Sequence, residues 1–237
     1  MKRIDAKALR YGDIHYGHSY NADRMFFLST YGNMAHHDNY NVMVQANVQN
    51  LLTVLHGFDG WMCYMSSSSV SLPVQTPYSR TKRAAEEILQ ALPIKSCIVR
   101  PYSVTGVGEQ KEHLIPTLIH SCMEGKEMPF DPWPVHDFVD VEDVIDGLIK
   151  LSEEKHTGMV EFGNCRPISN QHVKELVETV CGKKANTRMI VGALRPYDNA
   201  SWHCRTANSY WSPNKSLEQS IYEMVKAYRE QTRKTYH

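Results

Sequence analysis

The chain has 237 residues, and its 26 basic and 26 acidic residues give a formal net charge of zero. This length can bury a substantial core and suits one α/β domain, alone or with a small lobe. The balanced charge argues against a nucleic-acid partner, because such partners are bound by a basic surface. The start of the chain lacks a signal-peptide pattern, and no window is apolar enough for a transmembrane helix. We therefore expect no membrane association.

Six cysteines are scattered along the chain without a CxxC pair. Several of them fall in segments expected to form the core, where reduced cysteine behaves as a small hydrophobic residue. This usage predicts a reducing, cytoplasmic location. Of the 12 histidines, none forms an HxxxH or HExxH pattern, and the adjacent His36 and His37 point in different directions. We therefore expect no metal site.

Short apolar runs alternate with apolar residues at helical spacing along the chain. We predict strands at residues 8–11, 25–29, 61–65, 96–100 and 159–162, and helices at 44–55, 78–92, 114–124, 142–152, 171–181 and 217–228. A proline-rich loop is expected at 128–134. Strands that alternate with helices form parallel sheets through right-handed crossovers. The predicted fold class is therefore α/β, with a parallel sheet flanked by helices.

Tyr78 and Lys82 are four positions apart in a segment predicted to open a helix. That spacing puts the phenol and the ammonium on one helix face. A neighbouring cation favours the phenolate, so it lowers the pKa of a tyrosine toward a value useful for a general base. The same spacing also occurs by chance on an amphipathic helix. Four serines at 66–69 support the catalytic interpretation, because they end the strand predicted at 61–65, and open α/β sheets bind ligands at the carboxyl ends of their strands.

In this order, the segments resemble the extended short-chain dehydrogenase/reductase family, which includes NAD-dependent nucleotide-sugar epimerases and dehydratases. The matching motifs are Gly12-Asp13-Ile14, residues 26–32, Asn47-Val48-Gln49-Asn50, residues 66–70, Tyr78 with Lys82, Arg100-Pro101, residues 136–141, Phe162-Gly163-Asn164 and Arg195-Pro196-Tyr197-Asp198. The resemblance implies a Rossmann-like sheet with a small C-terminal substrate lobe. Residues 1–135 would form the Rossmann-like core, and residues 136–237 mainly the lobe, with 136–160 returning to the core.

The resemblance also implies a role for each matching residue. Tyr78 would exchange a proton with a sugar hydroxyl, Lys82 would lower the pKa of Tyr78 and hold the nicotinamide ribose, and Ser67 would hydrogen-bond the reacting oxygen. Ser68 is the alternative to Ser67. The implied cofactor, NAD or NADP, would contact Asp13, Ile14, Asn47 and Lys82. The implied substrate, a nucleotide sugar, would contact Ser68, Ser103, His136 and Arg195.

The sequence departs from the family at the cofactor and the substrate. It contains no GxxGxxG turn, which in the family cradles the dinucleotide pyrophosphate, and the elements around that turn have no counterpart before Gly12. The expected protein is therefore an N-terminally truncated relative, in which the strand at 25–29 becomes a sheet edge that the N-terminal segment or a partner chain would cover. His136 stands where the family has an arginine for the diphosphate, and Ser103 replaces an asparagine.

Three functions are compatible with these features. The favoured one is an enzyme, with NAD(P)-dependent redox chemistry on a nucleotide sugar. The second is a non-catalytic relative kept as a binding or assembly module. In the third, a separate polypeptide supplies the missing strands. We expect a homodimer or higher homo-oligomer, because the family packs the helix of Tyr78 and the helix of Val48 and Leu52 across a dimer contact.

Overall fold

The computed structural model describes residues 19–34, 36–190, 201–202, 204 and 211–235. Its centre is a four-stranded parallel sheet, built in the order β1 (Arg24–Phe27), β2 (Trp61–Met65), β3 (Ser96–Pro101) and β8 (Gly158–Phe162). The strands β2 and β3 are rich in apolar residues without strict alternation, as expected for parallel strands buried on both faces. The predicted fold class is confirmed.

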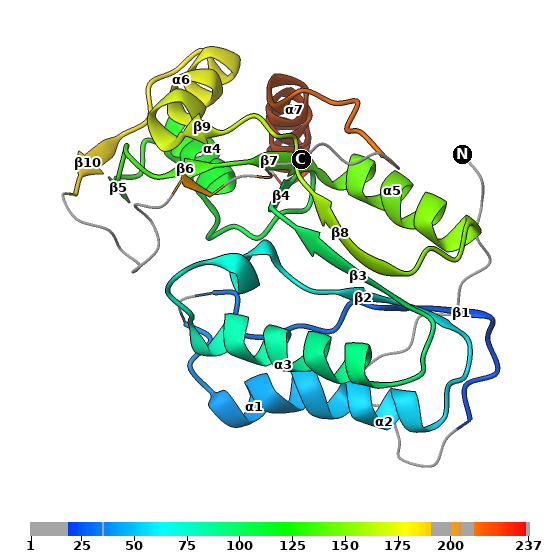
Figure 1. The fold of residues 1–237 in the computed structure, drawn as a ribbon. Helices are drawn as coiled ribbons and strands as arrows, with labels where there is room; N and C mark the ends of the chain where they lie inside the picture. Colours follow the sequence, from blue (N-terminus) through cyan, green and yellow to red (C-terminus); the bar gives the residue numbers. More distant parts are fainter. Residues whose placement is uncertain (1–18, 35, 191–200, 203, 205–210, 236–237) are drawn as a thin grey trace.

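Helices cover both faces of this sheet (Figure 1). One face carries α1 (Tyr40–Val44), a π-helical turn (Gln45–Gln49), α2 (Asn50–His56) and α3 (Pro77–Ala91), and the other carries α5 (Val141–Glu153). Side chains of β2 alternate between the two cores. Met62 and Tyr64 pack with α2 and α3, whereas Trp61 and Cys63 pack with α5.

The helix α3 begins where the sequence predicts it, because local groups satisfy its first turn. Thr76 caps the helix by accepting the N–H of Ser79, and the Ser79 side chain accepts the N–H of Thr76 in return. Pro77 occupies the first turn, where its missing N–H costs nothing. The buried inner face includes Ala85 and Leu89, which join the core under β1, β2 and β3.

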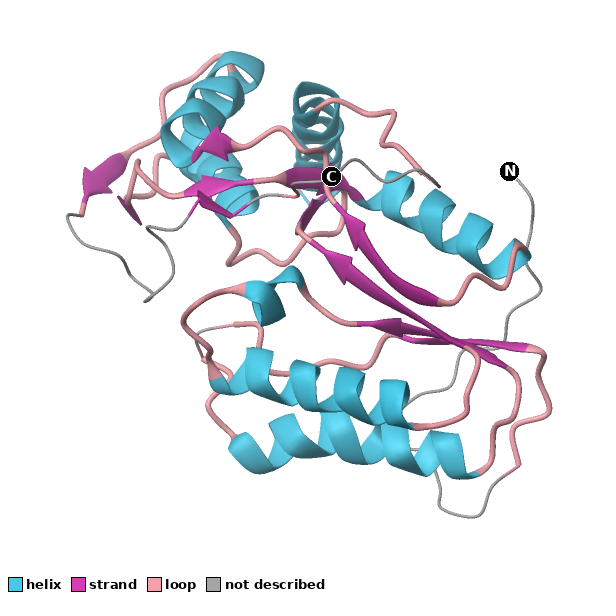
Figure 2. Ribbon diagram, viewed as in Figure 1, coloured by secondary structure: helices cyan, strands magenta, loops and turns pink. Residues whose placement is uncertain are grey.

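A second layer packs three helices against short strands beside the main sheet (Figure 2). Its helices are α4 (Leu114–Glu124), α6 (Asn170–Cys181) and α7 (Leu217–Thr235), which share one apolar core. Its strands are β4 (Ser103–Thr105) with β7 (Phe138–Asp140), β5 (Met128–Phe130) with β10 (Thr187–Met189), and β6 (Val135–His136) with β9 (Ile168–Ser169) and β11 (Ser201–Trp202).

The segment 128–134 is not wholly a loop, because residues 128–130 pair with β10 as β5. The predicted division of the chain at residue 135 stays a prediction. The elements α4 and β5 precede this residue, but they share an apolar core with α6 and α7, which follow it.

The strand β1 pairs only with β2 among the described strands, so it forms one edge of the sheet, as the sequence predicts. The strand predicted at 8–11, and the segment expected to cover this edge, lie outside the described residues. No helix within the described ranges is long and apolar enough to cross a membrane.

The carboxylate of Asp137 joins separate segments at the carboxyl end of β8. Asp137 is fully buried, and it accepts backbone N–H groups from Asn164, Cys165 and Cys204, each at 2.9 Å. Its own carbonyl accepts the N–H of Ser103 at 3.0 Å. This one side chain therefore fixes the loop after β8 and residue 204 against the segment that precedes β7.

We predict that Asp137→Asn lowers the free energy of unfolding by roughly 2–4 kcal/mol, because an amide N–H₂ would face backbone donors that the carboxylate accepts. Urea denaturation measures this change. Asp146→Asn is the control, since Asp146 is exposed on α5. Equal stability of the two variants would contradict the assigned role of Asp137.

Candidate functional site

The side chain of Lys82 is the centre of the candidate site. It is 1% exposed, and its Nζ donates to the carbonyl of Met65 at 2.9 Å and to the carbonyl of Ser29 at 3.2 Å. Met65 ends β2 and Ser29 follows β1, so the ammonium lies where two parallel strands end. It also lies 5.0 Å from the centre of the Tyr64 ring. Burial lowers the pKa of Lys82 to about 7, although nearby Glu86 acts in the opposite direction.

Tyr78 lies in the first turn of α3, one turn before Lys82 on the same helix, and its side chain is half-buried. Burial raises the pKa of Tyr64, and the neighbouring Tyr78 and Glu86 raise it further. Tyr78 is therefore close enough to Tyr64 for the two side chains to interact electrostatically. The helical arrangement of Tyr78 and Lys82 agrees with the expected spacing.

The serines at the end of β2 have different surroundings. Ser67 is half-buried, and its Oγ accepts the N–H of Ser69 at 3.2 Å and lies 2.9 Å from the Ser69 Oγ. Ser68 is fully buried, and its Oγ donates to the carbonyl of Pro101 at 2.7 Å. This placement favours Ser67 over Ser68 as the serine that meets a ligand, because the Ser68 hydroxyl donates to the protein itself.

Asn47 is fully buried in the π-helical turn between α1 and α2. Its Oδ1 accepts the N–H of Tyr31 at 2.9 Å, while its Nδ2 donates to the Tyr31 carbonyl at 2.8 Å and to the Thr81 Oγ1 at 2.9 Å. The amide thus clamps the loop after β1 to the helix of Lys82. Turns of this kind are frequent at functional sites.

The other predicted residues lie farther along the chain or beyond the described part. Ser103 begins β4 and His136 ends β6, and both are half-buried. The His136 ring lies 5.9 Å from the Phe138 ring, centre to centre. Asp13, Ile14 and Arg195 lie outside the described residues.

Sequence reasoning missed Glu86 and the two carbonyls that hold Lys82. Glu86 is 2% exposed on α3, four positions after Lys82, and it pairs with Arg100 at the end of β3. A glutamate on the inner face between Ala85 and Leu89 was the available signal, because charged residues are seldom buried without a partner.

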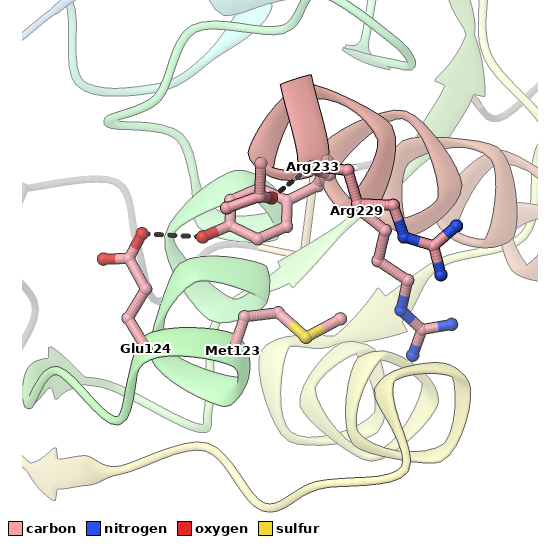
Figure 3. A pocket seen from close by; sticks show the side chains of 6 residues that line it. Met123, Glu124, Arg229 and Arg233 are labelled. Atoms are coloured by element: carbon pink, nitrogen blue, oxygen red, sulfur yellow. Dashed lines mark hydrogen bonds between the residues drawn. The ribbon is translucent and has the colours of Figure 1, made fainter. Parts of the chain in front are cut away.

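A surface pocket of about 430 Å³ lies elsewhere, between α4 and α7 (Figure 3). Its lining residues are Met123, Glu124, Tyr228, Arg229, Thr232 and Arg233, and none belongs to the predicted site. The Tyr228 hydroxyl donates to Glu124 at 2.6 Å across it. The strand ends around Lys82 therefore remain the candidate site, because the choice rests on the chemistry of their residues and not on the volume of a pocket.

Residues 63–162 match the family described as "NAD dependent epimerase/dehydratase family". This segment contains Ser67, Tyr78, Lys82, Ser103 and His136. A search of the curated proteins finds no match to the sequence.

Solved structures match most of the chain at low sequence identity. MoeE5 in complex with UDP-glucuronic acid and NAD has a TM-score of 0.78 at 19% identity, over 89% of this chain and 80% of that chain. The UDP-N-acetylglucosamine 4-epimerase from Methanobrevibacter ruminantium, in complex with UDP-N-acetylmuramic acid, has a TM-score of 0.77 at 17% identity, over 88% and 77%. A variant of UDP-glucuronic acid 4-epimerase from Bacillus cereus, in complex with UDP-4-deoxy-4-fluoro-glucuronic acid and NAD, has a TM-score of 0.78 at 17% identity, over 89% and 76%.

At these identities the structural likeness shows the fold, a Rossmann-like parallel sheet flanked by helices. The family model matches 100 of the 237 residues, and within that segment the chain resembles NAD-dependent epimerases and dehydratases, as its motifs predict.

The pKa of Lys82 predicts how stability depends on pH. The ordinary value for the unfolded chain is 10.5 and the folded value is about 7, so between these values the unfolded chain binds a proton that the folded chain does not. The free energy of unfolding should therefore rise from pH 7 to 10.5, by at most about 1.4 kcal/mol per pH unit from this residue.

Urea denaturation at several pH values, on the wild type and on Lys82→Met, isolates this contribution as the difference between the two curves. The variant should lack it. Parallel curves would show that Lys82 titrates normally in the folded protein.

Proposed function

We propose that the protein is a nucleotide-sugar epimerase/dehydratase-like enzyme that performs NAD(P)-dependent redox chemistry on a sugar nucleotide. The observation that supports this most directly is the buried ammonium of Lys82 at the carboxyl ends of β1 and β2. Tyr78 lies one turn before it, and Ser67 follows the same strand end as the Met65 carbonyl. Burying a lysine costs free energy, so its retention at a strand end favours a chemical role over a structural one.

The residues present fit the nicotinamide-ribose half of the dinucleotide. An ammonium has three N–H donors, and the carbonyls of Met65 and Ser29 occupy two, which leaves one for a ribose hydroxyl. Asn47 would shape this place from below, since its amide is bonded to Tyr31 and Thr81. Bound NAD(P) would supply the hydride donor and acceptor chemistry.

Within this site, Tyr78 would take a proton from a sugar hydroxyl and return it when the sugar is reduced again. Lys82 would stabilise the phenolate through its positive charge one turn away. The coupling would be mutual: a phenolate at Tyr78 would raise the pKa of Lys82, which burial lowers to about 7 against the opposing effect of Glu86. Ser67 would donate a hydrogen bond to the reacting sugar oxygen and hold it beside the phenol.

The remaining contacts are proposed from the family resemblance. Ser103 and His136, both half-buried, would meet the substrate, and Asp13 and Ile14 would meet the adenine end of the cofactor. Arg195 would supply a positive charge for a phosphate.

We also propose a homo-oligomer that forms through α1, α2 and α3. Val44 and Leu52 on these helices are 40% and 45% exposed, which gives the outer helical layer apolar surface for a second copy.

The proposed chemistry predicts that Tyr78→Phe lowers NAD(P)-linked turnover about 10²- to 10⁴-fold, because the phenol alone would carry the proton. Turnover is measured on a panel of UDP-sugars, with circular dichroism to confirm the fold. Tyr222→Phe is the control, since Tyr222 is 62% exposed on α7. Turnover that is absent in the wild type, or equal in Tyr78→Phe, would reject the proposed enzyme.

The two serine assignments make a separate prediction. Ser67→Ala should lower kcat with little effect on stability. Ser68→Ala should lower the free energy of unfolding by about 1–3 kcal/mol, because the hydrogen bond from the buried Ser68 hydroxyl to the Pro101 carbonyl is lost. Steady-state kinetics and urea denaturation of both variants measure the contrast, and the opposite pattern would exchange the two roles.

A non-catalytic binding or assembly module is the second candidate, and it is favoured by His136, which stands where the family resemblance implies an arginine for the diphosphate. Such a module would keep its full biological function in Tyr78→Phe. Loss of function with the fold intact would exclude it.

A further inference from the structure

The carboxylate of Glu86 is buried in a charged cluster that the proposed chemistry does not use directly. Its Oε1 accepts hydrogen bonds from the Ser66 hydroxyl and from Arg100 Nε, the latter at 2.9 Å. Its Oε2 accepts from Arg100 Nη2 at 2.5 Å, which makes the pair bidentate. The Glu86 and Arg100 side chains are 2% and 17% exposed.

Stability alone is a poor reason for this pair. Taking two charges out of water costs about as much as their attraction returns, and apolar residues of similar volume often serve equally well. A second explanation for the buried Glu86 is therefore needed, and the contacts of its carboxylate provide one.

The partners of Glu86 each belong to an element that carries part of the site. Glu86 itself lies on α3, four positions after Lys82. Ser66 follows the carbonyl that holds Lys82 and precedes Ser67. Arg100 precedes Pro101, whose carbonyl accepts a hydrogen bond from the Ser68 hydroxyl. One carboxylate thus joins the helix of the general base to the ends of two strands.

We infer that Glu86 is a positioning residue, which fixes the serine end of β2 against α3 and places a carboxylate one helical turn after Lys82. This inference rests on the proposed function. It adds a residue that touches neither substrate nor cofactor and acts through Lys82 and Ser67.

The electrostatic part follows from the groups around the ammonium. Within the described part of the chain, the titratable groups found to act on Lys82 or to contact it are Glu86, one turn later on α3, and Tyr64 of β2. Tyr78 acts on Tyr64 from the first turn of α3, and Arg100 pairs with Glu86 from β3. Among these, Glu86 is the carboxylate, and it raises the pKa of Lys82 against the effect of burial. Without it, Lys82 would lose its proton at lower pH, and a neutral amine stabilises a phenolate less.

The test measures the titration of Lys82 without relying on activity. The free energy of unfolding is followed against pH for each variant with and without Lys82→Met, and the difference gives the pH at which folded Lys82 loses its proton. Glu86→Gln should move that pH downward by about one unit or more. Glu87→Gln, a change at the exposed neighbour on the same helix, should leave it in place.

The positioning part has its own readout. Glu86→Gln should lower kcat about 10- to 100-fold with a smaller change in KM, because the reacting groups are misplaced while the substrate contacts remain. Glu86→Met combined with Arg100→Met provides a form without a stranded arginine, and it should fold and show the same two shifts.

An unchanged titration of Lys82 in the glutamate variants would overturn the inference, as would failure of both variant forms to fold, since the pair would then serve the fold. Absence of NAD(P)-linked turnover in the wild type would reject the proposed function instead. The pH titration would still decide whether Glu86 acts on Lys82.

Discussion

The buried ammonium of Lys82 joins the helix α3 to the ends of the strands β1 and β2, and the candidate site depends on this contact. Lys82 is placed under the ends of two parallel strands, where the carbonyls of Met65 and Ser29 replace the water it has lost. Parallel strands aim their last carbonyls at the same sheet edge, so a lysine from the covering helix can reach both. This contact ties α3 to the sheet and puts a titratable charge at the place where ligands enter such folds.

Neighbouring contacts hold the lysine in that position. Asn47 bonds the loop after β1 to Thr81, the residue before Lys82, and Glu86 bonds the next turn of the helix to Ser66. At the end of β8, the carboxylate of Asp137 accepts hydrogen bonds from three backbone N–H groups. Buried polar groups need partners, and here the partners come from segments far apart in sequence. Hydrogen bonds therefore hold the base of the candidate site, whereas Tyr78 and Ser67 are its half-buried groups.

Local signals in the sequence were sufficient for much of the fold. The apolar run at 61–65 became β2, and the periodic residues from Leu114 to Glu124 became α4. The helix of Tyr78 and Lys82 can be predicted because its capping residues and the apolar residues of its inner face are close together in the sequence. The pairing of strands that are far apart in the sequence cannot be predicted in this way. Residues 128–130 were expected to be loop because of their prolines, yet they form β5 against β10.

The candidate site divides in the same way. The placing of Lys82 and Tyr78 on one helix followed from their spacing, whereas the acceptors of Lys82 depend on strand register, which no local pattern encodes. The contact of Asn47 with the cofactor stays a prediction, whereas the bonds of its amide to Tyr31 and Thr81 depend on tertiary packing. The sequence leaves Ser67 and Ser68 as alternatives, and their burial and hydrogen-bond partners, which depend on tertiary packing, separate them.

The most direct test is calorimetric titration of the wild type and of Lys82→Met with NAD and with NADP. The account predicts that one of the two binds the wild type, and that the variant loses at least about tenfold in affinity, because a charged hydrogen bond to the ribose is removed. Equal affinity of the two proteins, or no binding of either dinucleotide to the wild type, would contradict it.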